Sequence, residues 1–355
     1  MTSEFDATYL NGEADAGPAA IGLSEDDPGG VPRKEEWEVA GLEHEPVLRA
    51  DVVRLLLPRP RPGLRLVDCT TGLGGHAEAL LEAAPPDAEL LGLDRDPIAL
   101  EKSARRLARY GDRVRLVQGR FSSLGNALDE VGWRSADAVL VDLGVSSMQL
   151  DDGGRGFSFR NDADLDMRMD PTRGVTAADL LEELEEGALA RILREKGEEP
   201  AARRIARAIK QTEKPPRTTG ELRALVQRVA GGRGRRHDPA TLTFQALRLA
   251  VNEEMEELDQ LLGDLPDRLI PESRVAILAY HSLEDRRVKR SFAAWCRNCV
   301  CPPALAICRC GGQARATAVV RRAIVAGDEE VAANPRARSA RLRVVEWCSQ
   351  SRGAE

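Results

Sequence analysis

Residues 64–76 read Leu-Arg-Leu-Val-Asp-Cys-Thr-Thr-Gly-Leu-Gly-Gly-His, and this stretch decides the fold. Its first part is a short apolar run, which predicts a buried strand. Asp68 ends the run, and a turn with three glycines follows. Residues 77–84 are strong helix formers. Strand, glycine turn and helix are typical of the opening unit of a nucleotide-binding α/β fold, where glycine lets the backbone approach a ligand closely.

The glycine turn leaves two ligands open. Residues 72–77 fit the dinucleotide pattern G-x-G-x-x-G/A, and Asp94 follows about 20 residues later. Asp68 favours S-adenosylmethionine (SAM), because a carboxylate attracts the cationic amine of SAM and repels a pyrophosphate. The pattern therefore favours a SAM enzyme, with an NAD-dependent dehydrogenase as the alternative.

Composition indicates a globular chain. Of its 355 residues, 42% are hydrophobic and 31% are charged, which is an ordinary balance. No apolar run approaches the roughly 18 residues of a membrane span. The acidic N-terminus lacks a secretion signal, so we expect a cytoplasmic protein. Seven cysteines are too few and too unevenly placed for a disulfide scaffold.

Charge is distributed unevenly along the chain. The net charge is −7, but residues 1–48 alone contribute −10, which leaves +3 for the remainder. Residues 1–40 have little apolar periodicity and predict a disordered acidic tail. Residues 203–236 carry 11 Lys/Arg and two Glu, and they end in Arg233, Arg235 and Arg236. This basic block favours contact with nucleic-acid phosphates, with a solvated helix face as the alternative.

Three more apolar runs predict strands of the same parallel sheet. They end at Asp94, Phe121 and Asp142. Because the carboxyl ends of parallel strands meet at one edge, we expect these residues to line a ligand site. Asp94 suits ribose hydroxyls, whereas Asp96 before Pro97 predicts a helix N-cap. Phe121 either stacks near an adenine or packs in the core.

The order of the predicted elements suggests that a helical insert divides the core into two parts. Residues 41–150 predict its first part and residues 238–355 its second. Between them, residues 151–237 predict a helical insert, a candidate for RNA binding. The glycine-rich stretch 146–159 predicts a loop, and Thr176 predicts the N-cap of a first insert helix. After the insert, apolar residues at helical spacing predict one long helix beginning near residue 240, with these core positions: Phe244, Leu247, Val251, Met255 and Leu258.

Eight sequence blocks resemble the RsmH/MraW family of bacterial 16S rRNA (cytosine-N4)-methyltransferases. They cover about residues 42–346 in the family's order and are specific when taken together. One departure is Leu242, where the family pattern has a basic residue. The matching blocks lie at residues 44–48, 68–76, 92–96, 142–149, 155–159, 244–248, 280–285 and 334–339.

The resemblance implies an α/β fold: a SAM-dependent methyltransferase core with a Rossmann-like parallel sheet and an inserted small helical domain. It implies methylation of the exocyclic N4 of a cytidine in the decoding centre of 16S rRNA, during maturation of the small ribosomal subunit. The turn glycines and His76 would meet the amino-acid part of SAM. Asp94 would hold the ribose and Phe121 would flank the adenine. The SAM contacts carried over are Gly74, Gly75, His76, Asp94, Phe121, Asp142 and Gln149.

Methyl transfer needs mainly alignment of nitrogen, carbon and sulfur, and such positioning is worth up to roughly 7–11 kcal/mol. Asp142 is the candidate catalytic residue, as the acceptor of an N4 proton. No covalent cysteine and no metal are needed, so Cys69 is interpreted as packing. The implied partner is 16S rRNA within the small subunit, with neither DNA nor membrane. The protein could form a homodimer. A non-enzymatic RNA-binding assembly factor is the alternative to an enzyme.

A cysteine cluster lies apart from these motifs. Four of its members form two C-x-C pairs, Cys299 with Cys301 and Cys308 with Cys310. A four-thiolate zinc site is one interpretation, although structural zinc usually prefers wider pairs. Free thiols are the alternative.

Overall fold

The computed structural model describes residues 19–20, 45–231, 238–299, 301, 305 and 312–348. The predictions for the rest of the acidic tail, for Arg233, Arg235 and Arg236, and for Cys308 and Cys310 therefore lie outside the described residues.

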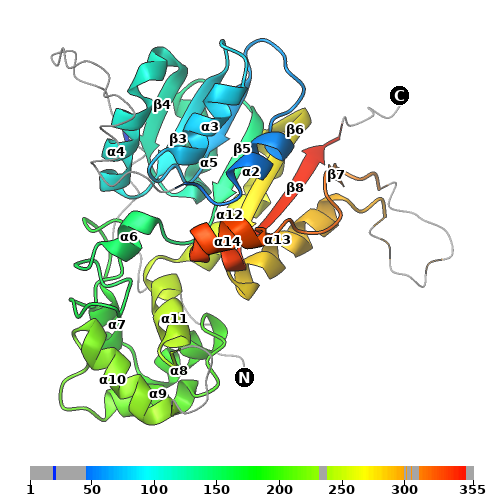
Figure 1. Cartoon of the computed structure of the whole chain (residues 1–355). Helices are drawn as coiled ribbons and strands as arrows, with labels where there is room; N and C mark the ends of the chain where they lie inside the picture. The colour runs from blue at the N-terminus through cyan, green and yellow to red at the C-terminus, as the bar shows by residue number, and fades with distance from the viewer. Residues whose placement is uncertain are drawn as a thin grey trace.

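A single mixed sheet is the centre of the molecule (Figure 1). Its strands are β1 (Ala19–Ala20), β2 (Arg65–Asp68), β3 (Glu89–Asp94), β4 (Val114–Gln118), β5 (Ala136–Asp142), β6 (Leu269–Ala279), β7 (Ala316–Ala318) and β8 (Arg341–Trp347). Within the described residues, their spatial order is β1-β4-β3-β2-β5-β6-β8-β7. The run from β4 to β6 is parallel, whereas β8 pairs antiparallel with both β6 and β7. The parallel part has the strand order of a doubly wound nucleotide-binding fold, with its switch point between β2 and β5.

Helices cover both faces of the sheet. Successive side chains of a strand point to opposite faces, and the strands here carry apolar side chains on both. In β2, Leu66 faces one hydrophobic cluster and Val67 the other, and both are fully buried. One face packs against α2 (Arg49–Leu56), α3 (Gly75–Ala83) and α4 (Pro97–Leu107). The opposite face packs against α5 (Leu124–Glu130), α12 (Glu254–Asp264) and α13 (Ser282–Trp295). None of the described helices is long and apolar enough to cross a membrane.

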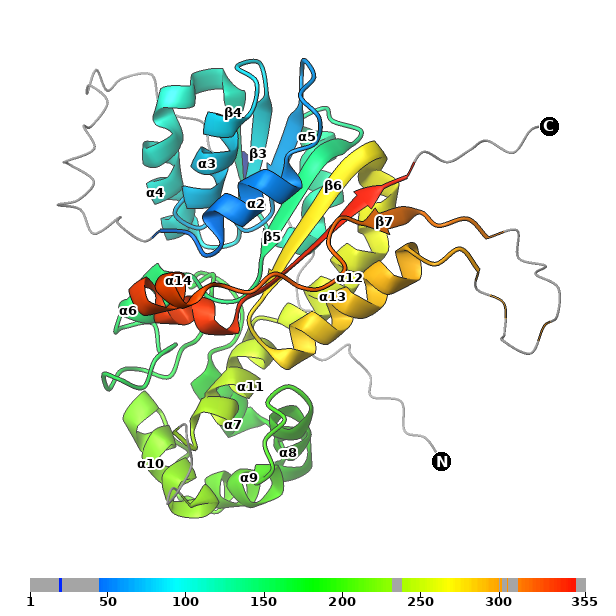
Figure 2. The same ribbon diagram turned by 45° about the vertical axis from the view of Figure 1, so that its right-hand side comes forward.

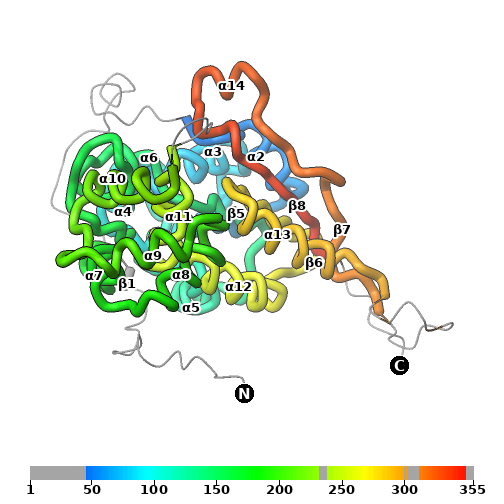
Figure 3. The backbone as a smooth tube through the Cα atoms, turned by 90° about the horizontal axis from the view of Figure 1, so that it is seen from below, coloured from blue at the N-terminus to red at the C-terminus, as the bar shows by residue number. Residues whose placement is uncertain are grey.

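The predicted insert forms its own hydrophobic cluster beneath the carboxyl ends of the strands (Figure 2). Figure 3 shows its helices gathered on one side of the molecule, seen from below. Phe244 and Leu247, which follow the predicted boundary at residue 237, also pack in this cluster. The second of its helices was not predicted from the sequence. The helices are α7 (Ala177–Glu183), α8 (Glu186–Glu195), α9 (Ala202–Lys210), α10 (Thr219–Ala230) and α11 (Thr241–Val251).

The prediction of one continuous helix after the insert is wrong. α11 ends at Val251 and α12 begins at Glu254, with Glu253 in the left-handed region at φ 52°. The Asn252 amide donates hydrogen bonds to the carbonyls of Met167 (2.8 Å) and Arg248 (2.9 Å). Asparagine side chains compete in this way with helical hydrogen bonds. The break sends α11 into the insert and α12 onto the sheet.

Local capping signals were read correctly. The Asp96 side chain accepts from the N–H of Ile98 (3.1 Å) at the start of α4. Thr176 caps α7 through a reciprocal capping box with Asp179. The loop predicted at residues 146–159 contains a short helix that the sequence did not indicate, α6 (Ser147–Asp151).

Candidate active site

A cavity lies at the carboxyl ends of β2, β3 and β5, beside the switch point of the sheet. Most of the residues predicted to contact SAM line it, although they come from distant parts of the chain. They are Gly75, His76, Asp94, Phe121, Asp142 and Gln149.

Gly74 is the predicted contact that does not line this cavity. Its backbone is left-handed, with φ 78°, and its N–H donates to the carbonyl of Thr71 (2.8 Å). A Cβ at this position would lie 3.3 Å from the Cβ of Ser103 in α4. In this structure, Gly74 therefore serves the turn and the packing of α3 on α4.

Gly75 is constrained by a different neighbour. A Cβ there would lie 2.5 Å from Cγ of Pro46, which also lines the cavity. The absence of a side chain lets residues 45–48 pack over the start of α3. The sequence indicated close approach at this glycine, but the segment that approaches is part of the protein itself.

Asp94 connects β3 to the glycine turn. Its carboxylate accepts hydrogen bonds from the N–H groups of Gly72 (2.8 Å) and Asp96 (2.9 Å). Burial nevertheless raises the pKa of Asp94 to about 6. Each carboxylate oxygen has a second lone pair, so the group can still accept hydrogen bonds from a ligand.

Asp68 and His76 present buried polar atoms that make no hydrogen bond within the described residues. Asp68 Oδ1 accepts from the N–H of Thr70 (3.2 Å), while Oδ2 has no hydrogen-bond partner in the described part of the chain. Burial raises the pKa of Asp68 to about 7, although nearby His76 opposes this shift. Both ring nitrogens of His76 are also buried without a hydrogen bond to any described residue. Such groups point to a polar ligand, because buried polar atoms are otherwise paired.

Asp142 lies between two aromatic side chains. Tyr280, just after β6, donates its hydroxyl to Oδ1 of Asp142 (2.8 Å). Nε2 of His76 lies 3.6 Å from Oδ2 of the same carboxylate. The backbone N–H of Asp142 donates to the hydroxyl of Thr70 (2.6 Å). Burial, followed by the charge of Asp142, raises the pKa of Tyr280 well above its usual range, so the phenol keeps its proton.

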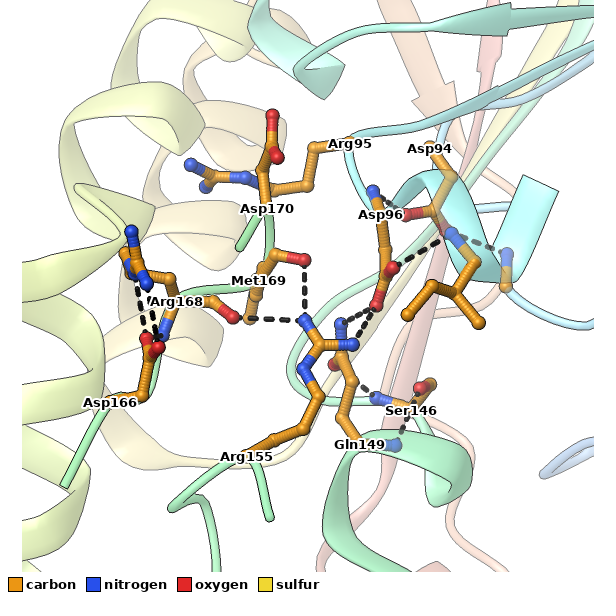
Figure 4. A network of polar contacts seen from close by, with 12 residues as sticks. Asp94, Arg95, Asp96, Ser146, Gln149, Arg155, Asp166, Arg168, Met169 and Asp170 are labelled. Atoms are coloured by element: carbon orange, nitrogen blue, oxygen red, sulfur yellow. Dashed lines mark hydrogen bonds and ion pairs between the residues drawn. The ribbon is translucent and has the colours of Figure 1, made fainter. Parts of the chain in front are cut away.

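The side chain of Gln149 joins the start of α6 to Asp96 at the cavity wall. Its Oε1 accepts from the N–H of Ser146 (3.0 Å), and its Nε2 donates to Oδ2 of Asp96 (3.0 Å). Figure 4 shows this amide between the start of α6 and Asp96. The sequence predicted Gln149 beside the methyl group. In the structure the amide oxygen and nitrogen both serve contacts within the protein.

Arg155 completes this network, and sequence reasoning gave it no role. Its Nη1 donates to Oδ2 of Asp96 (2.7 Å), and its Nη2 donates to the carbonyl of Met169 (2.7 Å) (Figure 4). Asp96 is fully buried, and Met169 lines the cavity. The glycine-rich stretch, the insert and the end of β3 are thereby joined at the cavity wall.

The donor set of the cavity fits SAM. Asp68 is not itself a lining residue, but it directly precedes the lining residues Cys69 and Thr70, and its buried carboxylate suits a cationic ammonium. His76 lines the cavity, and its ring offers a donor for a carboxylate. Asp94 offers acceptors for ribose hydroxyls and Phe121 an apolar surface. We find no group of three or more metal-ligating side chains in the parts of the chain that are described. Because Cys308 and Cys310 lie outside those parts, the zinc hypothesis stays a prediction.

Comparison with known proteins also indicates a methyltransferase. The MraW methylase family matches residues 41–348. The ribosomal RNA small subunit methyltransferase H of Anaeromyxobacter dehalogenans is 50% identical over 315 residues, covering 86% of this chain and 98% of that protein. The protein of the same name from Solidesulfovibrio magneticus is 48% identical over 309 residues, covering 85% of this chain and 95% of that protein. The resemblance seen in the sequence is confirmed: this chain belongs to the MraW methylase family, whose members are SAM-dependent methyltransferases.

Proposed function

We propose that this protein transfers the methyl group of SAM to the exocyclic N4 of a cytidine in the decoding centre of 16S rRNA, within the maturing small subunit. The observation that carries the proposal is the Asp142–Tyr280 pair at the carboxyl ends of two adjacent strands. The names of the relatives, small-subunit rRNA methyltransferases, support the substrate class.

The glycine turn and its neighbours would hold the methyl donor. When bound, SAM supplies an electrophilic methyl group on its sulfonium. Asp68 and His76 would bind the ammonium and carboxylate of the amino-acid part, since Oδ2 of Asp68 and both ring nitrogens of His76 are buried without a hydrogen bond to any described residue. Asp94 would accept from the ribose, and Phe121 would flank the adenine from the turn after β4.

Asp142 would act on the acceptor nitrogen. The N4 lone pair is delocalised into the pyrimidine, and a carboxylate that accepts an N4–H hydrogen bond favours its localisation. As N4 forms a bond to the methyl carbon, the carbon–sulfur bond of SAM breaks and S-adenosylhomocysteine leaves as a neutral thioether. The nitrogen becomes positive, and the negative carboxylate stabilises that charge. The N4 proton then passes to Asp142 or to water. Tyr280 orients the carboxylate through Oδ1, so that Oδ2, which lies 3.6 Å from Nε2 of His76, would accept from N4.

Labelling with tritiated SAM tests the proposal directly. Naked 16S rRNA and isolated small subunits are incubated with the enzyme, and the RNA is digested to nucleosides. We expect label in N4-methylcytidine at a single site of the decoding centre. Label in another nucleoside would contradict the assigned acceptor. RNA binding without label in either substrate would favour the non-enzymatic assembly factor.

A further inference from the structure

A second depression adjoins the candidate active site. It lies between the first half of α13 and the segment formed by η5 (Pro335–Ser339) and the start of β8. We call it the α13 groove. Its cationic lining residues come from both sides: Arg286, Lys289, Arg338 and Arg341.

Most of the positive charge in the α13 groove has no acidic partner among the described residues. Arg286 pairs with Glu198 of the insert (3.0 Å). Lys289, Arg338 and Arg341 are exposed, and no carboxylate of the described chain lies within 4.0 Å of them. The remaining unpaired charge is therefore cationic and faces solvent.

The acid inside the groove is already neutralised. Asp285 accepts from Nε (2.7 Å) and Nη2 (3.1 Å) of Arg343, a two-point contact. Such a bidentate pair holds the carboxylate strongly. Asp285 therefore does not cancel the charge of the three unpaired cations.

Tyr280 connects the groove with the reaction centre. It lines both depressions, and its hydroxyl contacts Asp142 at 2.8 Å. A polyanion lying in the groove would pass within one side chain of Asp142. A base on such a strand must leave its stack to reach the methyl donor, as bases do in enzymes that modify them.

We propose that the α13 groove binds the phosphates of the RNA strand that flanks the target nucleotide. This inference rests on the proposed rRNA substrate. Lys289, Arg338 and Arg341 supply the phosphate contacts from two sides, and Tyr280 marks where the base turns inward. No described residue of the basic segment 203–236 lines the groove, so the proposed phosphate site belongs to the methyltransferase core.

Salt dependence of binding measures these contacts. The test compares the wild type with a groove variant that combines Lys289→Ala, Arg338→Ala and Arg341→Ala. The control variant combines Arg59→Ala, Arg134→Ala and Arg290→Ala, which removes the same charge from exposed positions outside the groove. The probes are a single-stranded 16S rRNA fragment containing the decoding-centre target and an oligouridylate. We expect the groove variant to flatten the log affinity–log salt slope by roughly 2, since each single-strand phosphate contact contributes roughly 0.7.

The control variant should keep the wild-type slope, and both variants should keep wild-type SAM affinity. Equal slopes in the groove and control variants would overturn the proposal. Normal binding of naked RNA together with weakened binding of small subunits would also overturn it, because the groove would then contact ribosomal protein. If the wild type fails to methylate rRNA while the groove variant still loses slope, the proposed function fails and the groove assignment stands.

Discussion

The hydroxyl of Tyr280 donates a 2.8 Å hydrogen bond to Oδ1 of Asp142, from the end of one strand to the end of its neighbour. This contact restricts the rotation of the carboxylate at the cavity wall. It also fixes which oxygen remains available to a substrate. The pair therefore invites tests of each member separately.

Tyr280→Phe removes the hydroxyl and keeps the ring. We expect kcat to fall by roughly 10- to 100-fold, since a hydrogen bond to a charged group is worth about 1.5–3 kcal/mol. The KM for SAM should change little, and thermal unfolding should stay near the wild type. A proportional loss of SAM affinity would instead assign Tyr280 to cofactor binding.

Asp142→Asn keeps the shape of the side chain and removes its charge. We expect single-turnover methylation at saturating SAM to slow by about 100- to 1,000-fold, a cost of about 2.7–4 kcal/mol. Recovery of the rate at saturating SAM would remove Asp142 from the chemical step. Combined with Tyr280→Phe, the effects should be less than additive, because Tyr280 acts through this carboxylate.

The raised pKa of Asp68 predicts that the affinity for SAM depends on pH. Its pKa of about 7 lies above its usual range, so the free protein holds a proton there at mildly acidic pH. A bound ammonium favours the carboxylate, so SAM affinity should rise up to tenfold per pH unit between roughly pH 5.5 and 7. Calorimetry in buffers of different ionisation enthalpy should detect proton release on binding. Asp68→Asn should weaken binding and abolish this rise, and a retained rise would assign it to another group.

Gly75→Ala tests the contact with Pro46. The added Cβ would lie 2.5 Å from Cγ of Pro46, so residues 45–48 must move and deform the cavity. We expect at least tenfold weaker SAM binding, and Gly75→Asp should abolish it. Gly187→Ala is the control, because nothing lies within 4 Å of its added Cβ. Unchanged SAM affinity in Gly75→Ala would show that the segment yields without consequence.

Arg155→Ala breaks the buried pair with Asp96. Both side chains are at least nine-tenths buried, so the change leaves an uncompensated carboxylate at a cost of about 3–5 kcal/mol. We expect a clear fall in Tm together with weaker SAM binding. Arg105→Ala, which breaks an exposed pair with Glu101, should cost less than about 1 kcal/mol. A Tm loss no larger than that of this control would contradict the assigned role.

Sequence reasoning succeeded where the signal is local. The apolar run before Asp68 predicted a buried strand, and Asp96 before Pro97 predicted the start of α4. It failed at Asn252, because apolar spacing continues through residues 244–258 and hides the break in the helix. Periodicity describes which face is buried, but not which of two cores buries it.

Contacts between distant residues explain the other omissions. Tyr280 and Asp142 are 138 residues apart, and Arg155 and Asp96 are 59 apart. Tyr280 belongs to a block that carried the family resemblance, but no pattern in one sequence pairs it with Asp142. The available signal was that Tyr280 directly follows β6, the strand that pairs with β5. The zinc hypothesis and the role of Arg233, Arg235 and Arg236 remain predictions.

The break at Asn252 links the cavity to the orientation of the insert. The Oδ1 of Asn252 accepts from the N–H of Met169 (2.8 Å), and Met169 lines the cavity. The chain passes from the sheet into the insert before Met169 and returns to the sheet at Asn252, so this hydrogen bond joins the two connections. We expect a ligand that immobilises Met169 to restrict the orientation of the insert. If SAM favours one orientation of the insert, reciprocity predicts that an RNA that favours the same orientation raises SAM affinity by the same factor. We therefore expect Asn252 and Met169 to add a coupling between cofactor and substrate to their direct contact at the methyl group.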